Sequence, residues 1–333
     1  MVIRLAQAKR VRFARFSSAR YQQLNGTHVP VASHADIVNS MLKVGYASRL
    51  DAMLTVGPWR SDLLTALVEG YLRPDLRPTD YFLALEPSER VSMTFLLAQA
   101  FTHWAASHHL SVPILLHVVG AAPNWTLAAM PATAKLGAGP VKDKSRPDFI
   151  GVEPGGYHVF ESKGRSYQPG APIKSATAAA RCTKDALAQV SRIATINGAA
   201  PITRTAAVWI LRPHELRGYL TDPPRAAFAY DLSFDLRLAL LKYYRLILDA
   251  RTGLGSVYRG SFVRLPFGKR LLLVVDAKLL SLLEALEKPS GDPRPILDHL
   301  ERRAHVYVRL RRLAYRRPDL SFGLDGTGIQ LLP

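Results

Sequence analysis

RPDFIGVEPGGYHVFESK, residues 146–163, is the segment that decides how the fold of this chain is interpreted. It holds two β-patterned stretches, 148–153 and 157–163, joined by Pro154-Gly155-Gly156, which is the pattern of a β-hairpin. Proline cannot take the positive φ of a primed two-residue turn. We therefore expect a four-residue loop over 153–156, and its register sets Asp148 opposite Glu161.

The hairpin is expected to gather three charged side chains. Glu161 and Lys163 share a face because side chains alternate along a strand, and Asp148 joins them from across the hairpin. Two opposed carboxylates repel, and a hard divalent cation such as Mg²⁺ turns that repulsion into ligation while leaving room for water and phosphate. A lysine nearby can orient or deprotonate an attacking water and stabilise developing charge. The pattern predicts metal-assisted phosphodiester hydrolysis.

The elements around the hairpin are expected in the order helix, three strands, helix, strand. A long helix begins at Pro87-Ser88, and the periodicity then predicts a strand over 111–119, a loop over 120–145, the two hairpin strands, a helix over 176–197 and a strand over 205–211. The sequence therefore predicts an α/β fold with its core at 80–212.

Pro147-Asp148 followed by Glu161-Ser162-Lys163 resembles the signature of the PD-(D/E)XK nuclease superfamily. The element order over 88–211 is similar to the restriction-endonuclease-like core of that superfamily. The resemblance implies a Mg²⁺-dependent endonuclease acting on DNA, with Mn²⁺ able to substitute. It also implies that Asp148 and Glu161 hold the metal with the main-chain carbonyl of Ser162, and that Lys163 is the catalytic lysine.

The same resemblance carries further expectations. Many members add a glutamate from the first core helix, and here Glu89 is the better candidate and Glu86 the weaker one. Exonuclease-like branches carry a glutamine and a tyrosine on the helix after the lysine; Gln189 is present, but Ile193 stands four positions later. Bacterial defence and DNA processing are the implied roles. One active site cuts one strand, so double-strand cleavage would require a homodimer or a partner protein.

The composition of the 333-residue chain points to a polyanionic partner. Lys and Arg number 44 against 26 Asp and Glu, which gives a net charge of +18, and such an excess attracts nucleic acid. No apolar run reaches the roughly 18 residues that a membrane span needs. The single cysteine, Cys182, excludes a multi-cysteine zinc site and fits a reducing compartment. We expect a cytoplasmic protein that binds DNA and no membrane.

The chain is expected to divide into three regions. Residues 1–79 form a basic arm and helices at 34–44 and 59–73, with an organellar transit peptide as the alternative for the arm. After the core at 80–212, residues 213–333 form a basic α+β region with helices at 233–251, 277–288 and 295–316 and a hairpin over 261–276. The residues expected to contact nucleic acid are Lys142, Lys144, Arg146, Arg165, Arg309, Arg311 and Arg312.

Two other functions stay open at this point. A catalytically inactive nucleic-acid-binding module would keep the fold as a scaffold, although intact Asp148, Glu161 and Lys163 argue against it. A basic RNA-associated or assembly protein would carry the motif by accident. Mg²⁺-dependent nicking of plasmid DNA distinguishes a nuclease from the inactive binding module. Competition between RNA and DNA for binding tests the RNA-associated alternative.

Overall fold

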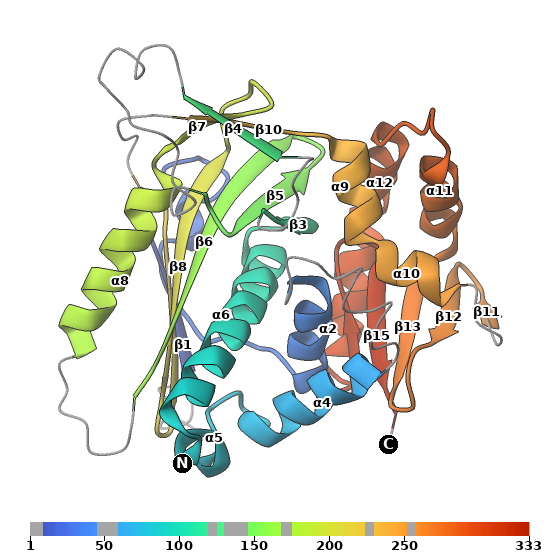
Figure 1. The fold of residues 1–333 in the computed structure, drawn as a ribbon. Helices are drawn as coiled ribbons and strands as arrows, with labels where there is room; N and C mark the ends of the chain where they lie inside the picture. Colours follow the sequence, from blue (N-terminus) through green and yellow to red (C-terminus); the bar gives the residue numbers. More distant parts are fainter. Residues whose placement is uncertain are drawn as a thin grey trace.

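The computed structural model describes residues 9–44, 59–118, 125–129, 146–167, 175–223, 230–251 and 257–332, which form a mixed α/β structure (Figure 1). Its largest sheet has seven strands in the order β2-β1-β9-β8-β6-β5-β3. In that order the strands span Gly26–His28, Lys9–Ala14, Glu215–Thr221, Thr203–Arg212, Gly156–Ser166, Phe149–Glu153 and Ile114–His117.

Helices cover both faces of this sheet, as Figure 1 shows with α8 and α6 on opposite sides. Alternation along β8 explains the arrangement. Val208 packs with Cys182 of α8 (Ser175–Val190). The next residue, Trp209, points the other way and lies 5.1 Å, between ring centroids, from Phe101 of α6 (Pro87–His109). The sheet is therefore the middle layer of three.

The hairpin register is the one expected from the sequence. Phe149 pairs with Phe160 and Glu153 with Gly156, so Asp148 stands opposite Glu161. The expected four-residue loop is wrong, because β5 and β6 continue to Glu153 and Gly156 and leave a two-residue turn. The positive φ that proline cannot take is found at Gly156, at +141°. Moving this conformation to the glycine lets Pro154 stay in the turn.

The expected core elements are present, with two corrections. The helix expected over 176–197 ends at Val190 and is followed by a strand, β7 (Ile193–Ile196). The described part of the expected loop at 120–145 contains a strand, β4 (Trp125–Ala129). Both join β10 (Tyr230–Phe234) in a small sheet of order β4-β10-β7. The local sequence pattern of β4 and β7 does not predict a strand; both segments are strands because they pair with β10, which is distant in the sequence.

The C-terminal part forms a five-stranded sheet of order β11-β12-β13-β15-β14. The expected hairpin is confirmed, whereas the helix expected over 233–251 is split into α9 and α10 and preceded by β10. The elements of this part are α9 (Leu236–Tyr243), α10 (Arg245–Ala250), β11 (Val257–Arg259), β12 (Phe262–Pro266), β13 (Leu271–Asp276), α11 (Ala277–Glu287), α12 (Arg294–Ala314), β14 (Leu320–Phe322) and β15 (Thr327–Leu331).

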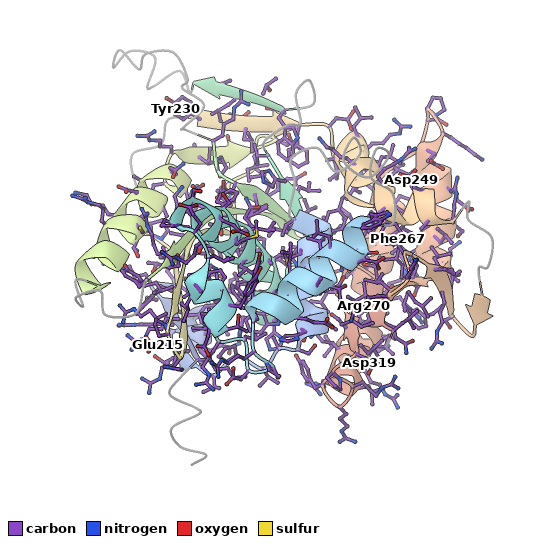
Figure 2. The ribbon with its side chains drawn as sticks, turned by 60° about the horizontal axis from the view of Figure 1, so that its bottom comes forward. Glu215, Tyr230, Asp249, Phe267, Arg270 and Asp319 are labelled. Carbon is purple, nitrogen blue, oxygen red and sulfur yellow. The ribbon has the colours of Figure 1, made fainter. Side chains whose placement is uncertain are left out.

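The N-terminal helices connect the seven-stranded sheet with the five-stranded sheet. The expected helices are found as α2 (His34–Val44) and α4 (Trp59–Tyr71), and two short elements precede and follow them, η1 (Gln22–Leu24) and α5 (Asp80–Ala84). Ser61 of α4 donates to the Phe267 carbonyl over 3.2 Å, and Asp62 accepts the Arg270 backbone N–H over 3.2 Å. Figure 2 labels Phe267 and Arg270 beside this helix.

Strands from all three expected regions share the seven-stranded sheet. β1 and β2 come from residues 1–79, and β9 comes from residues 213–333. One continuous apolar core accordingly runs from Val11 and Phe13 to Ile329. Across the described ranges, no helix has both the length and the apolar character needed to cross a membrane.

Candidate active site

The two hairpin carboxylates are held by each other's backbone. Asp148 precedes β5, and its Oδ2 accepts the Ser162 N–H over 2.8 Å. Glu161 lies in β6, and its Oε2 accepts the Asp148 N–H over 3.1 Å. Each side chain therefore accepts a hydrogen bond from the backbone of the opposite strand, just where the backbone pairing of β5 and β6 ends. These two bonds hold the carboxyl groups next to each other.

Lys163 completes this group. Its Nζ contacts Glu161 Oε1. The side chain of Lys163 is 34% exposed, whereas Glu161 is 1% exposed. The Ser162 hydroxyl lies 2.9 Å from that of Thr102 on α6, so its neighbours Glu161 and Lys163 point to the opposite face, the one that α8 covers. Solvent therefore reaches Lys163 far more readily than it reaches Glu161.

The electrostatics of the pair favour a positive partner. Burial, followed by the charge of Asp148, raises the pKa of Glu161 to about 7, and Lys163 opposes this rise. Burial also raises the pKa of Asp148, against the Ser162 N–H and the charge of Lys163. Both carboxylates are thus destabilised as anions, and either a proton or a cation would relieve them.

The donor set fits a hard divalent cation. Mg²⁺ takes one or two protein carboxylates and fills its remaining positions with water and phosphate oxygens. The Ser162 N–H points to Asp148, and the N–H and C=O of a paired strand residue lie on the same side. The Ser162 carbonyl therefore lies on the Asp148 side of β6. Among the described residues, no group of three or more His, Cys, Asp or Glu side chains converges anywhere.

Glu89 is not brought to this pair. It lies in the first turn of α6, where the Tyr71 hydroxyl donates to it over 3.5 Å. Thr102, which marks the level of Ser162, is about 20 Å further along the helix, and the pair lies on the other face of the sheet. Glu86 is the N-cap and accepts the Ser88 and Glu89 backbone N–H groups. Glu86 thus caps α6 and Glu89 lies in its first turn, so neither residue is included in the proposed site.

The candidate nucleic-acid contacts are separated by the structure. Lys142 and Lys144 lie outside the described residues. Arg309 and Arg312 are exposed on α12, and Arg165 is exposed on β6, where its Nε donates to Cys182 Sγ over 2.9 Å.

Besides Arg165, two further arginines of the candidate set have partners within the protein. Arg311 is half-buried and donates to the Ser107 carbonyl of α6 over 2.9 Å, which is a contact between helices. Arg146, two residues before Asp148, is half-buried and has a partner of its own. Arg165, Arg309 and Arg312 remain as exposed candidates.

The sequence also held a signal for a strand that was not predicted from it. Val11 and Phe13 of β1 are buried at 0% and 1% exposure, while Arg12 between them is exposed. Alternation of this kind is typical of a half-buried strand. The arm expected at the N-terminus is, over this stretch, part of the sheet.

Comparison with family models, curated proteins and solved structures found no match to this chain. The function is therefore inferred from its own residues.

Proposed function

We propose that this protein is a metal-dependent nuclease that hydrolyses phosphodiester bonds in DNA. The observation that carries the proposal is the group formed by Asp148, Glu161 and Lys163. The buried carboxylate of Glu161 and the half-buried carboxylate of Asp148 face one another at the end of a hairpin, both with raised pKa values, beside a partly exposed lysine. Keeping such a pair inside a fold is unfavourable without a cation, and the chain as a whole carries the positive charge that DNA would need.

The topology supports a restriction-endonuclease-like core. Among the elements expected from the sequence, the order is α6, β3, β5, β6, α8, β8, and their strands are neighbours in the sheet order β3-β5-β6-β8. β5 runs antiparallel to both of its neighbours, β3 and β6, and β8 runs parallel to β6. In such a core the hairpin that carries Asp148, Glu161 and Lys163 would lie at the centre, between helices on either face.

The residues would take distinct roles. Asp148 and Glu161 would hold Mg²⁺, or Mn²⁺, with the Ser162 carbonyl, and the bound ion supplies a polarised phosphate and a water of lowered pKa. The ammonium group of Lys163 would lie beside the attacked phosphate and stabilise developing negative charge there. The 34% exposure of its side chain leaves it accessible to a substrate.

Plasmid nicking with Mg²⁺ or Mn²⁺, compared with EDTA, tests the proposal. Asp148→Asn keeps the acceptor for the Ser162 N–H and removes one charge, so we expect cleavage to fall by orders of magnitude. DNA binding in EDTA should persist or tighten, and thermal stability without metal should not decrease. Lys163→Ala should abolish cleavage while metal binding, measured by calorimetry, is largely retained.

Matched controls exist in the C-terminal part. Asp298→Asn on α12 and Lys288→Ala directly after α11 remove the same charges from exposed positions and should cleave like the wild type. If Asp148→Asn nicks at the wild-type rate, the hairpin is not an active site, and the catalytically inactive DNA-binding module becomes the better interpretation of the same fold.

A further inference from the structure

The pairing between strands shows which residues point to the same face of the sheet as the candidate site. Residues paired in neighbouring strands point to the same face. Lys163 pairs with Val208, Val208 with Tyr219, and Tyr219 with Arg12. Lys163 and Arg12 thus point to one face, three strand spacings or about 14 Å apart.

The next row on this face repeats the pattern. Arg165 pairs with Ile210, Ile210 with Arg217, and Arg217 with Arg10. Since alternate residues on a strand are about 6.6 Å apart, Arg10 and Arg12 form a step of that length along β1. Arg12 is exposed and Arg10 is half-buried.

α8 continues the positive charge over the same face. It packs on β8 through Cys182, and its outward positions Arg181 and Lys184 are exposed. We call Arg10, Arg12, Arg165, Arg181 and Lys184 the α8-side basic surface.

Few acids balance this surface. Glu215 is occupied by Arg212 and Arg217, and Asp185 is exposed on α8. Within the described ranges, no ion pair engages Arg10, Arg12, Arg181 or Lys184, so their charges remain available to a partner.

We propose that the α8-side basic surface binds the sugar–phosphate backbone of DNA and carries it past the candidate site. The inference rests on the proposed nuclease function. Charge complementarity identifies the occupant: unpaired cations on β1 and on α8, at one face of the sheet, match a polyanion with regularly repeated charge. Arginine forks bind phosphate oxygens in pairs, and the surface shares the sheet face of Asp148, Glu161 and Lys163.

Binding of a fluorescent DNA duplex in EDTA, measured by anisotropy from 50 to 200 mM salt, tests the surface without cleavage. Arg10→Gln with Arg12→Gln should weaken binding to all sequences alike. It should also reduce the slope of log K against log salt by about 0.9 for each phosphate that the variant no longer neutralises. The matched control, Lys278→Ala with Lys288→Ala, removes two exposed charges from the two ends of α11 and should leave the slope nearly unchanged. Thermal melting verifies that each variant is folded.

Cleavage separates this surface from the active site. With Mg²⁺ and duplex well below saturation, the arginine double variant should nick DNA more slowly, in proportion to its weaker binding, whereas the Lys278→Ala with Lys288→Ala control should nick like the wild type. An unchanged slope in a folded double variant, with normal wild-type cleavage, overturns the surface and leaves the nuclease standing. A reduced slope with no wild-type cleavage under any metal overturns the nuclease and leaves the surface. Wild-type protein that does not bind DNA overturns both.

Discussion

Glu161 shows at the scale of one residue how the fold creates a site. Its side chain is 1% exposed and faces a second carboxylate, so its negative charge has lost water and gained a repulsive neighbour. Lys163 compensates part of this from a position that solvent reaches. A surface pair of the same residues would be worth about 0–1 kcal/mol and would have no such pKa shift. Burial is what turns an ordinary Glu–Lys pair into a group that prefers a proton or a metal ion.

This preference predicts the pH dependence of stability without metal. The pKa of Glu161 rises from 4.5 in its ordinary state to about 7 in the folded chain, so between these values the folded state binds more protons than the unfolded state. The stabilisation is present below pH 4.5 and is lost as the pH rises through about 7. In EDTA, the melting temperature of the wild type relative to Glu161→Gln should therefore fall by a few degrees from pH 5 to pH 8.

Mg²⁺ should reverse most of this loss at pH 8 and have little effect at pH 5, since a protonated carboxyl binds it poorly. Glu301→Gln, an exposed position on α12, is the control and should follow the wild type. If wild type and Glu161→Gln show parallel melting curves across the range, the shifted titration does not belong to Glu161.

At the scale of elements, the site depends on how closely β6 packs on α6. A Cβ on Gly164 would lie 2.6 Å from the Thr94 carbonyl oxygen and 2.9 Å from the Ala98 Cβ. Both obstacles belong to the helix, one of them to its backbone, so they cannot rotate away. Because Gly164 follows Lys163 directly, any displacement of β6 is passed to that lysine.

Gly164→Ala is therefore expected to destabilise the protein by about 1–3 kcal/mol, the usual effect of overpacking, and to reduce nicking. Urea unfolding and plasmid nicking measure the two effects. Gly70→Ala on α4 is the matched control, because a Cβ there meets nothing within 4 Å; it should be neutral or slightly stabilising, as alanine is the better helix residue. Equal stability of the two variants would show that β6 and α6 can separate without penalty.

At the scale of the whole molecule, helix α2 of the N-terminal region is bonded to the C-terminal five-stranded sheet region. Lys43 near the end of α2 lies 2.9 Å from Asp325, which is 1% exposed. Asp36 of α2 accepts the Ser321 hydroxyl over 2.7 Å. The N-terminal helices are thus fastened to the C-terminal sheet, and the seven-stranded sheet takes strands from both sides of the core. Its parts should unfold together.

Lys43→Ala leaves the buried charge of Asp325 without its cation and should lower the free energy of unfolding by about 3–5 kcal/mol. Hydrogen exchange should then show faster opening in β6 as well as in β14 and β15. Lys288→Ala, which removes an exposed lysine, should change neither quantity. Faster exchange confined to β14 and β15 would mean that the C-terminal sheet opens on its own.

The sequence by itself determined the hairpin, its register and the neighbouring helices. These depend on short-range rules: a turn residue sets the register, and alternation sets which side chains share a face. Asp148 therefore stands opposite Glu161 as expected, even though the turn is shorter than expected. The long helices were equally accessible, since their apolar periodicity is local.

Only the tertiary structure decided where the remaining charges lie. The alternation in β1 is local, but its parallel pairing with β9 joins residues distant in sequence, and no local pattern encodes that contact. Arg311 and Arg312 are neighbours in the chain, yet one turns to the Ser107 carbonyl and the other to solvent. Glu89 lies in the first turn of a helix, far from the pair that it was expected to join. Residue types reveal which chemistry is available, but the packing of elements decides which groups meet, because contact depends on long-range geometry.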